Sequence, residues 1–90
     1  MMSNRTAVYP GSFDPPTRGH LDLIERATDI FDQVVVAVAV NRSKRQLFKI
    51  SERIEMLEEM IAPFTGVEVD TFQDLTVDFA RKRGAIAVIR

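Results

Sequence analysis

Val34-Val-Val-Ala-Val-Ala-Val40 decides the fold of this chain, because it is an unbroken apolar run. A strand with one face in water alternates apolar and polar side chains, whereas a strand inside a parallel sheet is covered on both faces and is apolar throughout. The run therefore predicts the central strand of a parallel sheet, and such a strand requires helices on both sides.

Apolar runs and helical spacing extend this prediction along the chain in both directions. The other predicted strands are Thr6–Tyr9, which the turn signal Pro10-Gly11 closes, Val67–Val69 and Ala85–Ile89. Three helices are predicted between the strands. The first starts at Thr17 after two prolines, and its apolar face continues to Phe31. The second and third are expected to be capped by Ser51 and Asp74, and the third to end at Gly84.

The predicted order of elements is β-α-β-α-β-α-β, within a single domain over residues 1–90. Right-handed crossovers then predict a Rossmann-like, doubly wound α/β sheet with strand order 3-2-1-4. Ligands of such sheets bind beyond the carboxyl ends of the strands, where the strand order reverses. We therefore expect a site between the loop after Tyr9 and the end of the last strand at Arg90.

Composition and charge exclude several classes of protein. The 90 residues carry a formal net charge of -1, which argues against nucleic acid or an anionic membrane as a partner. The sequence contains no cysteine, so it has no disulfide and no cysteine-based zinc site. Without a signal peptide or an apolar run long enough to cross a bilayer, the chain is expected in the cytoplasm.

The segment Gly11–His20, with the sequence G-S-F-D-P-P-T-R-G-H, occupies the expected site. Gly11 permits a tight turn, and Thr17 and His20 lie on one face of the first helical turn. The free N–H groups of that turn favour a phosphate, and Gly19 leaves room for it. Neither G-x-G-x-x-G nor G-x-x-x-x-G-K-[ST] is present, so the loop is neither a dinucleotide fingerprint nor a P-loop.

Plainer interpretations exist for the two most reactive side chains. A single histidine in the first turn of a helix is usually a surface or capping residue, which is one interpretation of His20. Lys44 lies among other basic residues, so it could be an ordinary solvated lysine; its neighbours are Arg42, Arg45 and Lys49. Only the combination of the loop with its place at the switch point favours function.

The loop resembles the signature of the nucleotidyltransferase superfamily whose hallmark is H-x-G-H or T-x-G-H. Other segments narrow the resemblance to the bacterial phosphopantetheine adenylyltransferase family: Tyr9-Pro10, Ile30–Asp32, Ser43-Lys44 with Phe48, Asp78–Ala80 and Val88–Arg90. The resemblance implies transfer of AMP from ATP to 4′-phosphopantetheine, which gives dephospho-coenzyme A and pyrophosphate. It also implies Mg²⁺ with the ATP and a homohexamer.

The resemblance also implies roles for particular residues. His20 would stabilise the transition state as the catalytic residue and would bind ATP together with Ser12 and Phe13. The acceptor would be bound by Ser12, Lys44, Thr76 and Arg90. The loop would be shaped by Gly11, Asp14, Thr17 and Gly19. Position 76 departs from the family, which has a larger apolar residue nearby, so a hydrophobic contact to the acceptor would be weaker there. No ligand cluster marks a metal site.

Two alternatives stay open at the level of the sequence. The chain ends at Arg90 directly after a strand, so we expect it to be the N-terminal portion of such a domain, and one alternative to a working enzyme is a catalytically incomplete nucleotide-binding fragment. A related nucleotidyltransferase is the other alternative, either a cytidylyltransferase or a nicotinamide-mononucleotide adenylyltransferase. Such relatives usually carry histidine where Thr17 stands, and this favours the first interpretation.

Overall fold

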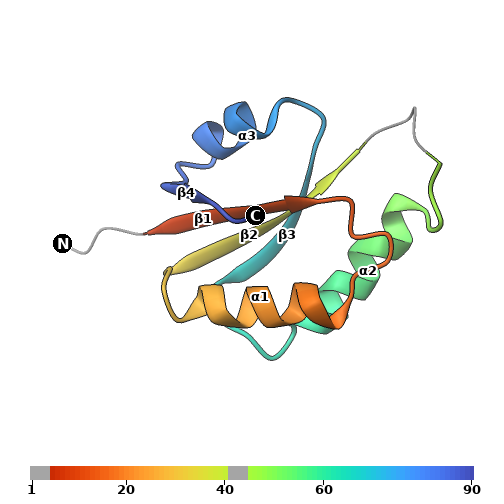
Figure 1. Ribbon diagram of the computed structural model, residues 1–90, viewed down its shortest axis with the longest axis horizontal. Helices are drawn as coiled ribbons and strands as arrows, with labels where there is room; N and C mark the ends of the chain where they lie inside the picture. Colours follow the sequence, from red (N-terminus) through yellow and green to blue (C-terminus); the bar gives the residue numbers. More distant parts are fainter. Residues whose placement is uncertain (1–4, 41–44) are drawn as a thin grey trace.

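The computed structural model describes residues 5–40 and 45–90 (Figure 1). The strands are β1 (Thr6–Gly11), β2 (Gln33–Ala39), β3 (Val67–Phe72) and β4 (Ala87–Val88). The helices are α1 (Arg18–Thr28), α2 (Ile50–Ile61) and α3 (Thr76–Lys82). No helix in these two ranges is both long enough and apolar enough to cross a membrane.

The strands form one parallel sheet with the order β3-β2-β1-β4, which confirms the predicted fold class and strand order. β1 pairs with β2 along the full length of β1, from Thr6 opposite Gln33 to Gly11 opposite Val38. The shared direction brings the carboxyl ends of the strands to one edge of the sheet. That edge carries the loop from β1 to α1.

Strand β2 is fully covered on both faces, as its apolar run predicts. Val34, Val36 and Val38 have no exposed surface and pack into a core with residues of α1 and α2. Val35 and Ala37 face the other way and pack against Phe79 and Ala80 of α3. Figure 1 shows α1 and α2 on one face of the sheet and α3 on the opposite face.

The predicted turn at Pro10-Gly11 is wrong, because β1 continues through both residues. The carbonyls of Thr6 and Val8 accept N–H bonds from the β4 side of the sheet. Since alternate residues face the same neighbour, Pro10 also faces β4, whose pairing with β1 ends at Val8. The missing N–H of the proline therefore costs the pairing of β1 with β2 nothing.

Two predicted helix caps are also wrong. Helix α2 starts at Ile50, so Ser51 lies inside its first turn; the Lys49 N–H donates to Oε1 of Glu52 at 2.9 Å and closes the helix start without a serine. Helix α3 starts at Thr76 with Leu75 as the residue before it, and the carboxylate of Asp74 accepts from Nζ of Lys82 at 3.0 Å in place of a backbone N–H of the helix.

The ends of two helices set where the flanking segments begin. Helix α1 ends at Thr28, so Phe31 lies beyond it, although its side chain still packs on the core. Gly84 has a φ of 68° and is the residue after the cap of α3, as predicted. Its N–H and that of Ala85 donate back to carbonyls of α3. Ala85 is therefore part of the helix cap, and β4 is shorter than the predicted strand.

Candidate nucleotide and acceptor site

The loop between β1 and α1 is held from inside by Phe13. Its backbone has a φ of 50°, a conformation that costs most residues energy, and its ring is buried. The ring packs edge-on against Tyr9, with centroids 5.3 Å apart, and against His20 at 4.7 Å. A Cβ at Gly11 would lie 3.1 Å from the Phe13 ring, so glycine permits this packing. The ring of Phe13 is therefore part of the core and not open to a ligand.

Thr17 and His20 cap the start of α1 reciprocally. The Thr17 N–H donates to Nδ1 of His20 at 2.8 Å, and the His20 N–H donates to Oγ1 of Thr17 at 3.3 Å. A backbone N–H can only donate, so Nδ1 must carry a lone pair. The neutral imidazole therefore has its proton on Nε2, which makes Nε2 a hydrogen-bond donor at the positive end of the helix.

We expect an imidazole titration to show a lowered pKa for His20. Burial disfavours the charged form and lowers the pKa from its ordinary value of 6.5. The unfolded chain then binds the proton more readily, so this contribution to stability is complete above pH 6.5 and is lost as the pH falls towards the lowered pKa. His20 is the sole histidine of the chain, so NMR can follow its ring directly. A pKa above 6.5 would contradict the arrangement.

Asp14 ties the β1–α1 loop to the segment that leads into α2. Its two carboxylate oxygens accept from the backbone N–H groups of Leu47 at 2.7 Å and Phe48 at 2.8 Å. The Asp14-Pro15 peptide bond is cis. The carboxylate therefore aligns two segments that come from the ends of different strands.

Replacing Asp14 with asparagine is expected to lower the free energy of unfolding by about 1–3 kcal/mol, because one charge-assisted acceptor becomes an amide donor that faces a backbone N–H. Urea denaturation measures the change. Asp22→Asn is the control, since Asp22 is exposed and, among the described residues, pairs with Arg26 at the surface, so its loss should change stability by about 0.5 kcal/mol or less. Equal losses in both variants would mean that the Asp14 contacts contribute nothing of their own.

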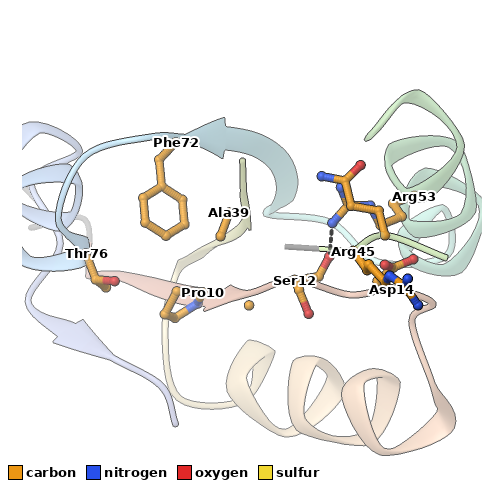
Figure 2. Close-up of a pocket in the computed structure, with 10 residues that line it drawn as sticks. Pro10, Ser12, Asp14, Ala39, Arg45, Arg53, Phe72 and Thr76 are labelled. Carbon is orange, nitrogen blue, oxygen red and sulfur yellow. Dashed lines mark hydrogen bonds between the residues drawn. The ribbon is translucent and has the colours of Figure 1, made fainter. Parts of the chain in front are cut away.

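A cavity of about 410 Å³ lies at the carboxyl edge of the sheet (Figure 2). Its walls come from the ends of three strands, the start of α3, and α2 with the segment before it. The lining residues include Pro10, Ser12, Ala39, Phe72 and Thr76. The wall beside α2 is polar and cationic, with Arg45, Gln46 and Arg53 next to Asp14. The cavity therefore combines an apolar part with a positively charged part.

The structure brings some of the predicted site residues together at this cavity and places others elsewhere. The residues that line it are Gly11, Ser12, Asp14 and Thr76. Phe13 lies within the loop and His20 in the first turn of α1, and neither lines the cavity. Arg90 follows β4, is exposed, and does not line the cavity. Lys44 lies outside the described residues. The ligand contacts of all these residues stay predictions.

Gly19 has free space next to it. A Cβ there would meet only Oγ1 of Thr17, at an ordinary contact distance of 3.5 Å. Packing within the described parts of the chain therefore does not demand glycine at this position. The predicted role of Gly19 in leaving room for a ligand stays a prediction.

Sequence analysis missed Arg53, which is 1% exposed and lines the cavity. The signal was its spacing. Arg53, Leu57 and Ile61 are four residues apart and form the buried stripe of α2. A charged residue at the same helical spacing as the apolar residues of a buried face is predicted to be buried as well, and a buried charge is a candidate functional residue.

The fold and the loop together define a Rossmann-like α/β protein whose first helix starts beyond the carboxyl end of its first strand. The chain belongs to the cytidylyltransferase-like family, whose family model matches residues 8–90. Among the described residues, no group of three His, Cys, Asp or Glu side chains could hold a metal ion.

Three bacterial proteins named phosphopantetheine adenylyltransferase are close relatives. The chain is 49% identical over 86 residues to that of Desulforamulus reducens, with 96% of this chain and 53% of the relative covered. It is 52% identical over 86 residues to that of Desulfitobacterium hafniense, with the same coverage. It is 51% identical over 84 residues to that of Heliobacterium modesticaldum, with 93% and 50% covered. The chain thus spans about half the length of these curated relatives.

A solved structure has the same fold. The nicotinic acid mononucleotide adenylyltransferase of Plasmodium falciparum, complexed with NaAD, superposes with a TM-score of 0.70 at 16% identity. The match covers 90% of this chain and 45% of that chain. At this low identity the likeness shows the fold alone.

Proposed function

We propose that this chain supplies the nucleotide loop and the acceptor cavity of an enzyme that transfers AMP from ATP to 4′-phosphopantetheine. The products would be dephospho-coenzyme A and pyrophosphate. The observation that carries the proposal is the start of α1, where the Thr17 N–H orients His20 with its Nε2 as a donor. The names of the relatives at 49–52% identity support the choice of substrates.

The proposed reaction needs no general base. A phosphate monoester has a second pKa of about 6, so at neutral pH it is already a dianionic nucleophile. One of its oxygens attacks the α-phosphorus of ATP, a new P–O bond forms, and the bond to the departing pyrophosphate breaks. The protein has to align the two phosphates and to stabilise negative charge on the α-phosphoryl oxygens. Nε2 of His20 and the free N–H groups of α1 suit that task.

The cavity suits the acceptor. Its apolar wall, with Ala39 and Phe72, fits the uncharged pantetheine arm, and its cationic wall fits the phosphate. Ser12 belongs to the nucleotide loop and also lines the cavity, so it is placed to contact both substrates. The short, polar Thr76 gives the arm less apolar surface than a larger residue would.

The remaining predictions about the active enzyme belong to the same proposal. Mg²⁺ would arrive with ATP, held by phosphate oxygens and water, because the described residues offer no cluster of carboxylates for it. A homohexamer is proposed from the family resemblance and can be checked by light scattering.

The direct test is pyrophosphate release by this chain with ATP, Mg²⁺ and 4′-phosphopantetheine. CTP in place of ATP, and nicotinamide mononucleotide in place of the acceptor, are the controls for the related nucleotidyltransferases. Release with the proposed pair alone would support the proposal, and release with a control pair would contradict it. A catalytically incomplete nucleotide-binding unit is the second candidate, because the chain spans about half the length of its relatives. It predicts that a folded sample binds ATP without releasing pyrophosphate.

A further inference from the structure

Arg53 is a buried cation in the wall of the cavity. Its side chain extends from the first turn of α2, and its Nη1 donates to the backbone carbonyl of Ser12 at 2.7 Å (Figure 2). Its Nε and Nη2 are buried, and neither has a hydrogen-bond partner among the described residues. The ion pairs found in the described ranges of the chain do not include it.

This placement is costly for a guanidinium group. Burying a cation away from water costs on the order of several kcal/mol unless a counter-charge offsets the cost. The start of a helix also carries partial positive charge, which repels a cation there. One carbonyl of Ser12 satisfies a single nitrogen and brings no negative charge. An anion in the adjoining cavity would supply the missing counter-charge.

We propose that Arg53 is the buried counter-charge that makes the cavity select a phosphorylated acceptor. The inference rests on the proposed function, since it concerns the phosphate of the same acceptor. The Nε and Nη2 atoms of Arg53 are buried and Nη1 is bonded to Ser12, so the side chain does not contact the acceptor directly. Arg53 is therefore a positioning residue. It acts on the phosphate through its charge, and it holds the Ser12 carbonyl so that the loop stays in place. Arginine suits this role because it stays protonated when it is buried.

The test compares the affinities for 4′-phosphopantetheine and pantetheine, measured by calorimetry on the same protein. The parent should prefer the phosphorylated compound. Arg53→Gln removes the charge and leaves a shorter polar side chain, so the preference should fall by about tenfold or more while pantetheine affinity changes by about threefold or less. Arg26→Gln is the matched control, since Arg26 is an exposed α1 residue paired with Asp22, and it should leave the preference unchanged.

Arg53→Lys gives a second readout that does not depend on how well the glutamine variant folds. A buried lysine loses its proton as the pH rises, whereas arginine does not. Between about pH 7 and 9.5 the phosphate preference of Arg53→Lys should therefore fall, while that of the parent stays level. The other charged residues that line the cavity, Asp14 and Arg45, are the same in both proteins, so a difference between the two pH profiles comes from position 53.

The outcomes separate this inference from the proposed function. Equal weakening of both ligands in Arg53→Gln, or parallel pH profiles for Arg53→Lys and the parent, would overturn the role of Arg53 alone. A parent that binds pantetheine as tightly as 4′-phosphopantetheine would overturn the proposed acceptor and this inference with it. Selective loss of the phosphate preference supports both.

Discussion

Turnover in the pyrophosphate-release assay is expected to fall by about a hundredfold or more when His20 is replaced with alanine. The variant loses the Nε2–H that is available to a phosphoryl oxygen as negative charge develops there. It also loses the acceptor for the Thr17 N–H, but such an exposed capping contact contributes only about 1 kcal/mol to stability. The variant should therefore remain folded while its turnover is largely lost.

His20→Asn separates the two roles of the side chain. An asparagine oxygen can take the place of Nδ1 and accept from the Thr17 N–H, but nothing then reaches the position of Nε2. We expect this variant to recover the stability that the capping contact contributes and to stay as slow as His20→Ala. Full turnover in His20→Asn would show that the cap, and not the donor, is what the reaction needs.

Gly66→Ala is expected to lower the free energy of unfolding by about 3 kcal/mol or more, a large share of the stability of a small domain. Gly66 has a φ of 76°, and a Cβ there would lie 2.6 Å from the backbone carbonyl oxygen of Asp32. The chain cannot shift away cheaply, because the carbonyl of Gly66 accepts from the N–H of Val34 at 2.8 Å, at the start of the central strand. Urea denaturation measures the loss.

Gly84→Ala is the matched control. Gly84 has a similar φ of 68°, but a Cβ there would meet nothing within 4 Å. This variant bears only the backbone cost of the left-handed conformation, about 1–2 kcal/mol. The difference between the two variants then measures the clash with Asp32. Equal losses would show that backbone conformation alone explains the cost at Gly66.

The architecture was predictable because burial leaves a direct mark on composition. The run from Val34 to Val40 is apolar throughout, since β2 is covered on both faces by helices. The alternation of strands and helices then left the 3-2-1-4 order as the most probable arrangement, because right-handed crossovers exclude most others. Gly84 was recognisable as a helix end for an equally local reason: glycine readily adopts the positive φ that the residue after a helix cap needs, and Gly84 has that φ in the structure.

Helix starts and strand ends were predicted less well, because they depend on partners distant in sequence or on competing local contacts. Ser51 and Asp74 are good capping residues by type. Neither caps a helix in the structure: the N–H of Lys49 at the start of α2 donates to Glu52, and Asp74 accepts from Lys82. These choices were settled by geometry that residue type does not reveal.

The candidate site divides in the same way. The residue types of the loop from Gly11 to His20, together with its place after the first strand, indicated a phosphate site, because a helix start offers free N–H groups wherever it occurs. The tautomer of His20 depends on the local geometry that places the Thr17 N–H 2.8 Å from Nδ1. The bond from Arg53 to the Ser12 carbonyl and the bond from the Leu47 N–H to Asp14 each join atoms of separate segments 2.7 Å apart. Local pattern thus specified the elements and the chemistry of one loop, and folding alone set the long-range contacts, because they form only when the sheet brings its carboxyl ends together.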